Sequence, residues 1–270
     1  MIIRSRLSGI ILLIKHSLCK NIMNRVLYKA TVGMSPAKVF KLIRCNDVLY
    51  LKISHKKYEG TTFDVKREKD VIVWLADKIS VPRVIQYEET DDHRFLLMDE
   101  VRGKMASSVT SAPKRVVEIY AESISRLQSI DISHCPFNSS IRYRLSELDY
   151  LLKSNLAEVG DFYKGEIPFS NPEELVAYLK MNMIEEDLVF SHGDICDSNI
   201  IINKDSQDIN GYIDWGRGGK ADRWYDIAFC VRSIREDLGN EDYIKYFFDL
   251  LGIEPDWARI TYYLWLDELF

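Results

Sequence analysis

The chain has 270 residues, of which 47% are hydrophobic, and its formal net charge is -5. This composition excludes a disordered chain and a protein with one small core, and it fits one large globular domain or two packed lobes. The five cysteines form no C-x-x-C pair, which argues against a disulfide framework and against a zinc site. We therefore expect a cytoplasmic protein with reduced thiols.

The N-terminal segment combines basic residues with a short apolar run from Gly9 to Ile14. This run is too short to cross a membrane, and no cleavage site of small residues follows it. We therefore expect neither a membrane span nor a secretion signal, and predict an amphipathic helix or an extension of the fold. The sequence indicates no function for residues 1–30 and no oligomeric state.

Charge is divided unevenly along the chain. Residues 1–60 hold 12 Lys or Arg and 2 acids, whereas residues 181–270 hold 8 Lys or Arg and 19 acids. The basic charges are spread through strand-like and helix-like segments without a Lys/Arg run, which argues against nucleic-acid binding. Two explanations remain: ordinary solvated surface, or a polyphosphate bound by the first part and a polycation bound by the second.

The first hundred residues predict an antiparallel sheet. Apolar and β-branched residues over 39–43 and 48–52 flank Asn46-Asp47, which predicts a hairpin. Two further strands, over 84–85 and 95–98, flank a turn of polar residues.

One helix is expected between these pairs of strands. Val71, Leu75 and Ile79 recur at helical spacing, and Thr61 with Asp64 supplies an N-terminal cap. We predict that Pro82 ends this helix.

The remaining chain predicts a mostly helical lobe. Apolar stripes at helical spacing cover 117–127 and 145–152, and short strands are expected over 188–190, 200–202 and 211–213. Helices rich in aromatic residues then follow.

These elements predict an α+β fold. An N-terminal nucleotide-binding lobe covers residues 1–98, a hinge covers 99–103, and a catalytic C-terminal lobe covers 104–270.

The most specific motif is Ser191-His192-Gly193-Asp194, followed by Asn199 after five residues and by Asp214 after twenty. Phosphoryl transfer needs a group that orients the attacking hydroxyl, together with oxygen ligands for a Mg²⁺ on the nucleotide phosphates. Asp194, Asn199 and Asp214 supply these groups in the order that protein kinases use. For any one of them a turn cap is the better explanation, but the whole set favours catalysis. We assign His192 to holding the loop.

A lysine for the phosphates is expected in the first lobe. Lys52 ends a predicted strand, and Glu68 lies on the buried stripe of the following helix, where a carboxylate needs a cationic partner. We therefore predict that Lys52 and Glu68 form an ion pair. Residues 33–37 replace the Gly-rich loop of protein kinases, and no A-P-E segment is present, which argues against a protein substrate.

Taken together, these residues resemble the aminoglycoside phosphotransferase family, and they are most similar to its 3′-phosphotransferases. The resemblance runs from Gly33 to Phe270 and implies a bilobal, protein-kinase-like fold and an ATP-dependent kinase. It rests on seven segments: 33–39, 50–52, 67–70, 189–199, 213–217, 221–232 and 266–270.

The resemblance implies a nucleotide site with ATP held between the lobes. Tyr50 would stack on the adenine, and the backbone of Asp99 and Val101 would hydrogen-bond its edge. Ser35 would close over the phosphates, and Lys52, braced by Glu68, would contact them.

The resemblance also implies the catalytic roles. Asn199 and Asp214 would hold Mg²⁺, and Asp194 would accept the proton of the attacking sugar hydroxyl. Arg217 would approach the transferring phosphate or the substrate, although a structural ion pair is an alternative for an arginine beside two acids.

The implied substrate is an aminoglycoside, whose ammonium groups need carboxylates around the reacting ring. The matching groups in this chain are Asp161, Glu166, Glu236, Asp237, Glu268 and the terminal carboxylate of Phe270. Two alternatives remain open. One is a metabolic kinase for choline or homoserine, and the other is a catalytically inactive binding module of the same fold.

Overall fold

The computed structural model describes residues 16–22, 25–29, 35–109, 112–157 and 167–270. The chain divides into two compact units, each continuous in space but not in sequence. The first unit comprises Met1–Arg102 and Asn210–Arg217, and the second comprises Gly103–Ile209 and Gly218–Phe270.

The first unit contains an antiparallel five-stranded sheet in the order β1-β2-β3-β5-β4. The predicted hairpin is present as β2 and β3, and the second pair of strands as β4 and β5. The strands are β1 (Val26–Lys29), β2 (Lys38–Arg44), β3 (Asp47–His55), β4 (Val84–Glu89) and β5 (His93–Asp99).

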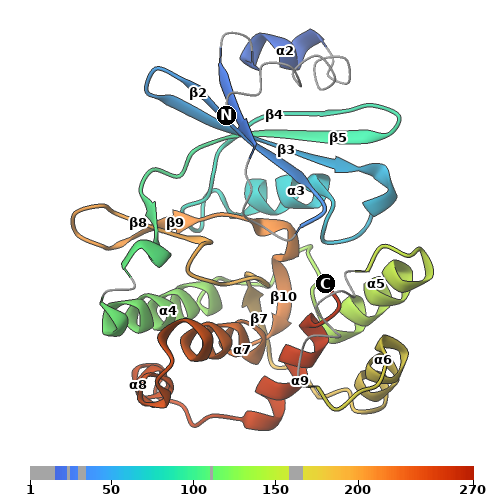
Figure 1. Cartoon of the computed structure of the whole chain (residues 1–270), viewed down its shortest axis with the longest axis vertical. Coiled ribbons are helices and arrows are strands. Elements are labelled where there is room, and N and C mark those ends of the chain that lie inside the picture. The colour runs from blue at the N-terminus through green and yellow to red at the C-terminus, as the bar shows by residue number, and fades with distance from the viewer. Residues whose placement is uncertain (1–15, 23–24, 30–34, 110–111, 158–166) are drawn as a thin grey trace. The chain divides into compact units, whose positions relative to one another are not determined.

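The two faces of this sheet are covered by different helices (Figure 1). Because side chains alternate along a strand, Leu49, Leu51 and Ile53 of β3 all face one core. Leu18 and Ile22 of α2 (His16–Ile22) are buried in that core. The other face, which carries Lys52, is covered by α3 (Val65–Leu75).

Helix α3 begins as predicted but ends earlier than predicted. The carboxylate of Asp64 accepts a hydrogen bond from the backbone N–H of Lys66 at 3.0 Å and caps the helix. The prediction that Pro82 ends the helix is wrong. The amides of Lys78 and Ile79 both donate to the Leu75 carbonyl, which forms a turn, and the three residues that follow Leu75 are exposed.

The second unit is mostly helical. Helix α7 packs against α9, and α4 packs against α8. The helices are α4 (Pro113–Gln128), α5 (Ile141–Lys153), α6 (Pro172–Met181), α7 (Trp224–Ser233), α8 (Glu241–Leu251) and α9 (Trp257–Asp267), with a π-helical turn, η5 (Ile234–Leu238), after α7.

Short strands frame the loops of this unit. Strand β7 pairs with β10, and β6 pairs with β8, both antiparallel. These strands are β6 (Lys104–Met105), β7 (Leu188–Ser191), β8 (Ile200–Ile202) and β10 (Gly219–Asp222), while β9 (Ile209–Tyr212) passes from the second unit into the first.

The α+β class predicted from the sequence is confirmed, with one main helix on the sheet of the first unit and a mostly helical second unit. Strand β10 was not predicted. In the part of the chain that the structure describes, no helix has the length and apolarity needed to cross a bilayer.

Candidate active site

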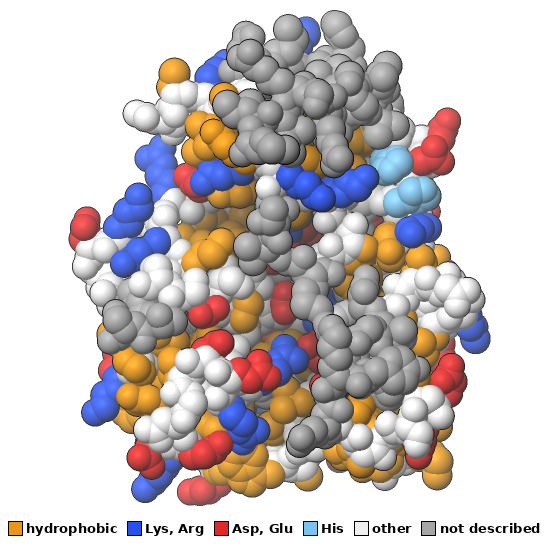
Figure 2. Space-filling view, viewed as in Figure 1, with side chains coloured by type: hydrophobic (Ala, Val, Ile, Leu, Met, Phe, Trp, Pro, Cys, Tyr) orange, Lys and Arg blue, Asp and Glu red, His pale blue; other side chains and the backbone are white. Residues whose placement is uncertain are grey.

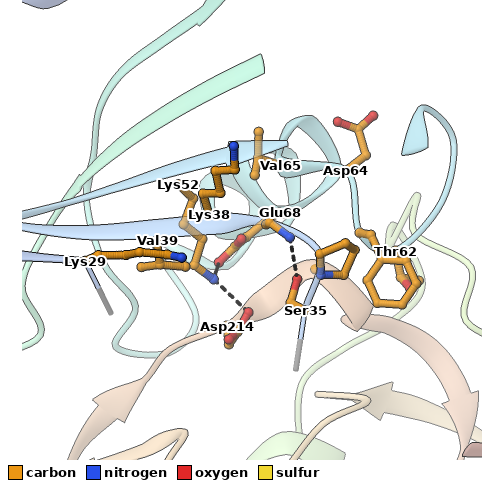
Figure 3. Close-up of a pocket in the computed structure, with 14 residues that line it drawn as sticks. Lys29, Ser35, Lys38, Val39, Lys52, Thr62, Asp64, Val65, Glu68 and Asp214 are labelled. Atoms are coloured by element: carbon orange, nitrogen blue, oxygen red, sulfur yellow. Dashed lines mark hydrogen bonds and ion pairs between the residues drawn. The ribbon is translucent and has the colours of Figure 1, made fainter. Parts of the chain in front are cut away.

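Three charged side chains meet in the first unit (Figure 3). The ammonium nitrogen Nζ of Lys52 donates to Oε1 of Glu68 and to Oδ1 of Asp214, each at 2.7 Å. The side chains of Lys52 and Glu68 are only 10% and 5% exposed, whereas that of Asp214 is 44% exposed. The predicted contact between Lys52 and Glu68 is therefore present, and Asp214 joins it.

The neighbouring carboxylates keep the side chain of Lys52 positively charged. Burial lowers the pKa of Lys52, but Asp214 and Glu68 outweigh burial, and its pKa is raised above the ordinary value. Burial raises the pKa of Glu68, against the opposing effect of the Lys52 ammonium. A lysine that stays charged at every physiological pH is suited to contact phosphate oxygens.

The segment that carries Asp214 is fixed to the first unit by its neighbours. The backbone N–H of Tyr212 donates to the carbonyl of Ser80 at 3.1 Å, and Nε of Arg67 donates to the carbonyl of Gly216 at 2.9 Å. A Cβ atom on Gly216 would lie 2.5 Å from the carbonyl oxygen of Thr62, so glycine permits this close approach. Asp214 therefore stays beside Lys52.

A pocket of about 440 Å³ opens beside the three charges. Ser35 lines it, and its hydroxyl accepts a hydrogen bond from the backbone N–H of Ala37 at 3.2 Å. Lys29 of β1 also lines the pocket and extends toward Lys52 (Figure 3). Sequence reasoning missed Lys29, because only the pairing of β1 with β2 brings it to this site. Lys38 also lines the pocket, and three lysines in one pocket suit a polyphosphate.

The residues expected at adenine lie elsewhere in the first unit. The ring of Tyr50 lies 5.5 Å from Nζ of Lys41. The carboxylate of Asp99 accepts from Arg83, and the Asp99 backbone N–H donates to the Arg83 carbonyl at 3.0 Å. Neither Tyr50, Asp99 nor Val101 is among the described residues that line the 440 Å³ pocket. Their roles at adenine stay predictions, as does that of Arg217 in the 3₁₀ turn Trp215–Arg217.

In the second unit, Asp194 and Asn199 lie in contact. The amide nitrogen Nδ2 of Asn199 donates to the backbone carbonyl of Asp194 at 2.8 Å and to its Oδ2 at 3.1 Å. Asn199 is buried, whereas Asp194 is half-buried and reaches solvent. The amide thus orients the carboxylate and directs its own carbonyl oxygen away from it.

The loop that carries Asp194 is held by Asp226 of α7. The buried carboxylate of Asp226 accepts hydrogen bonds from the backbone N–H of His192 at 2.7 Å and of Gly193 at 2.8 Å. Gly193 has a φ of 78°, in the left-handed region that favours glycine. Asp226 lies in a segment that carried the resemblance, but the sequence alone gave it no role.

Replacing Asp226 by Asn is expected to lower kcat by about 10²-fold, because the amide presents an NH₂ to one of two backbone donors and the loop shifts. The KM for ATP should change little, since Asp226 belongs to the second unit. Steady-state kinetics and thermal unfolding check this expectation. Unchanged kcat in a folded variant would contradict it.

The second unit carries several acidic side chains, and three of them, Asp267, Glu236 and Asp194, act on the charge of Arg232. Glu236 and Asp237 are exposed on η5, and Glu268 follows α9. Nη1 of Arg232 donates to Asp267 at 2.9 Å. Burial lowers the pKa of Arg232, but nearby carboxylates outweigh burial and raise it. These carboxylates are those of Asp267, Glu236 and Asp194.

Asp197 also belongs to this acidic surface, because burial and then the charge of Asp237 raise its pKa. Sequence reasoning missed Arg232, Asp267 and Asp197. Asp161 and Glu166 lie outside the described residues. In Figure 2, acidic and basic side chains are interspersed on the visible face.

Each unit holds an oxygen donor of the kind that magnesium binds. These are the carboxylate of Asp214 in the first unit and the side-chain carbonyl oxygen of Asn199 in the second. Among the residues that the structure describes, no group of three or more His, Cys, Asp or Glu forms a metal cage.

Comparison with known proteins agrees with this chemistry. The sequence profile of the "Phosphotransferase enzyme family" matches residues 32–263. The chain belongs to this family. It is 53% identical over 246 residues to an aminoglycoside 3′-phosphotransferase of Enterococcus faecalis, covering 90% of this chain and 92% of the relative. It is 41% identical to one of Campylobacter jejuni, covering 91% and 97%.

Solved structures of the family share the fold. An aminoglycoside phosphotransferase of Streptomyces rimosus superposes with a TM-score of 0.82 at 26% identity, covering 97% of each chain. A second structure of that enzyme, in complex with ADP and streptomycin, gives a TM-score of 0.77 at 25% identity, covering 97% of this chain and 98% of the other. The predicted kinase-like fold and family are therefore confirmed.

Proposed function

We propose that this chain transfers the γ-phosphate of ATP to the 3′-hydroxyl of aminoglycoside antibiotics and so confers resistance to them. The observation that carries this proposal is the presence of several acids near the Asp194 loop. The chain is also a member of the phosphotransferase family, and its lysine cluster is of the kind found in kinases. The relatives from E. faecalis and C. jejuni, both aminoglycoside 3′-phosphotransferases, support it.

The residues that would bind the nucleotide are identified by their charge. The ammonium groups of Lys52 and Lys29 would contact the triphosphate, and Glu68 keeps Lys52 extended into the pocket. Asn199 and Asp214 would hold a Mg²⁺, which neutralises charge on the phosphates when it is bound. The ADP complex of the S. rimosus relative supports nucleotide use.

In the transfer step, one group of the site would accept the proton of the attacking hydroxyl. The 3′-oxygen of the sugar forms a bond to the γ-phosphorus while the bond from that phosphorus to the β-bridging oxygen breaks, and ADP leaves. The carboxylate of Asp194 accepts the hydroxyl proton. Asn199 orients this carboxylate through its contact with Oδ2, and Asp226 holds the loop through two backbone amides.

The acidic surface would bind the substrate amines. An aminoglycoside carries several ammonium groups, and each gains most from a carboxylate that is partly shielded from water. Glu268 and Asp197 are partly buried carboxylates of this kind, and the exposed Glu236 and Asp237 add negative charge. A choline-type kinase would need an aromatic cage for one quaternary ammonium, so several acids favour a polyamine.

The proposed compartment is the cytoplasm, where ATP is available. Among the described residues, Cys45, Cys135, Cys196 and Cys230 are all free thiols, which is typical of a reducing compartment.

A pair of substrates tests the position of transfer. Kanamycin, which has a 3′-hydroxyl, is expected to be phosphorylated, whereas a 3′-deoxy aminoglycoside should give no transfer above background ATP hydrolysis. Mass spectrometry of both products and the resistance profile of cells expressing the chain are the measurements. Equal phosphorylation of both drugs would contradict the 3′ assignment, and turnover of choline or homoserine alone would point to the metabolic alternative.

A further inference from the structure

A buried arginine lies against the last residue of the second unit. Arg144 of α5 has no exposed surface, and its Nη1 donates to Oε2 of Glu147 at 2.8 Å. The guanidinium carbon Cζ lies 3.6 Å from the centroid of the Phe270 ring. This distance is that of a stacked cation–π contact. Such contacts strengthen as water is excluded, and Arg144 is fully buried while Phe270 is half-buried.

The contact between Arg144 and Phe270 is connected to the acidic surface by the residues that end α9 and follow it. Phe270 lies three residues after Asp267, and its backbone N–H donates to the Asp267 carbonyl at 3.1 Å. Asp267 in turn accepts from Arg232, whose charge environment includes Glu236 and Asp194. Contacts therefore lead from Arg144 through Phe270 and Asp267 to Arg232, and the charges of Glu236 and Asp194 act on Arg232.

An arginine at this place is an unusual choice for packing alone. A buried ion pair adds little stability compared with apolar side chains of similar volume, because both charges lose their hydration. The planar guanidinium, however, fixes the angle of an aromatic ring and cannot lose its charge. Arg144 is thus suited to set the direction of a chain segment.

We propose that Arg144 is a positioning residue for the aminoglycoside. Its stack on Phe270 fixes the segment Asp267–Phe270. Asp267 then stays paired with Arg232, and the half-buried carboxylate of Glu268 keeps the place in which it meets a substrate ammonium group. This inference rests on the proposed function, because it concerns the substrate side of the same site.

Substitutions of Phe270 test the stack without touching the buried ion pair. Phe270→Leu removes the aromatic face and is expected to raise both the KM and the dissociation constant for kanamycin by about fivefold to tenfold. The KM for ATP and kcat at saturating kanamycin should each stay within about twofold. Phe270→Tyr keeps the aromatic face and is expected to recover most of the lost affinity.

Substitutions of Arg144 need a partner change, because removing the arginine alone leaves Glu147 buried without its cation. The double variant Arg144→Met with Glu147→Leu removes both charges and keeps an apolar core. It should raise the kanamycin KM as Phe270→Leu does. Adding Phe270→Leu to it should give little further loss, since both changes break one contact. The buried Phe247→Leu in α8 serves as a control for general loss of packing.

Three results would overturn the proposal. One is the same kanamycin affinity in Phe270→Leu as in Phe270→Tyr. Another is full additivity of the Phe270 and Arg144 changes. A third is an effect of Phe247→Leu on the kanamycin KM as large as that of Phe270→Leu. If the unmodified protein binds kanamycin but transfers no phosphate to it, the proposed function fails, whereas calorimetric binding of kanamycin still tests the role of Arg144.

Discussion

Replacing Asp194 by alanine is expected to lower kcat for phosphate transfer to kanamycin by about 10²- to 10⁴-fold, the usual contribution of a positioned proton acceptor. The attacking hydroxyl then loses both the group that orients it and the group that takes its proton. The KM for ATP should remain nearly unchanged, because the lysine cluster lies in the other unit. Steady-state kinetics with both substrates provide the measurement.

The matched control for this variant is Asp205→Ala, since Asp205 is an exposed aspartate on a turn of the same unit. It should show unchanged kcat. Mg-ATP should raise the melting temperature of Asp194→Ala as it raises that of the unmodified protein. An Asp194→Ala protein that retains most of its activity would remove Asp194 from the mechanism. Absence of any Mg-ATP stabilisation in the unmodified protein would instead favour an inactive binding module.

Replacing Lys52 by methionine should cost both activity and stability. Removing one partner of a buried ion pair typically costs about 3 kcal/mol or more, and here it leaves Glu68 and Asp214 facing each other. We expect a loss of this order in the free energy of unfolding near pH 8, together with a large rise in the KM for ATP. Chemical denaturation at several pH values and ATP kinetics are the measurements.

The pH dependence of the Lys52→Met variant has a defined sign. Burial already raises the pKa of Glu68 in the folded protein, and loss of the lysine removes the opposing effect. A carboxyl with a raised folded pKa binds its proton more tightly when folded, so stability falls as pH rises through that pKa. The difference between variant and unmodified protein should therefore shrink toward pH 5.

Two further variants separate the loss of the buried charge pair from the general effect of replacing a lysine. Adding Glu68→Gln to Lys52→Met should restore part of the lost stability but none of the ATP affinity. Lys66→Met removes only an exposed pair with Asp70 on α3 and should change stability by less than about 0.5 kcal/mol. Equal effects of Lys66→Met and Lys52→Met, or a Lys52→Met loss that grows as pH falls, would contradict the electrostatic account.

The sequence predicted the parts of the site that follow local rules. Lys52 ends a run of β-forming residues, and Glu68 lies on the buried stripe of an amphipathic helix, so their contact required only that the helix pack on its own sheet. The Asp194 and Asn199 contact spans five residues of one loop. Such short-range patterns are readable, because secondary structure fixes which side chains share a face.

The other parts of the site depend on long-range contacts, which no periodic pattern in the sequence predicts. Asp226 accepts hydrogen bonds from backbone amides 33 and 34 residues earlier in the chain. Because almost every residue has a backbone N–H, the sequence does not indicate which of them will be such a donor. Lys29 enters the pocket through the pairing of β1 with β2. The end of α3 was misplaced because Pro82 was the visible helix breaker, whereas the helix stops where its buried face stops, at Leu75.

The discontinuous first unit has a consequence for biosynthesis. Asn210–Arg217 belongs with the first hundred residues, so Lys52 and Glu68 emerge from the ribosome long before Asp214. At about 5–20 residues per second, roughly 6 to 23 seconds separate the synthesis of Arg102 from that of Arg217. During this interval the carbonyl of Arg102, the carbonyl of Ser80 and the guanidinium of Arg67 lack the partners that residues 210–217 later supply. The nascent chain thus completes its N-terminal sheet domain only after most of the helical domain has been translated.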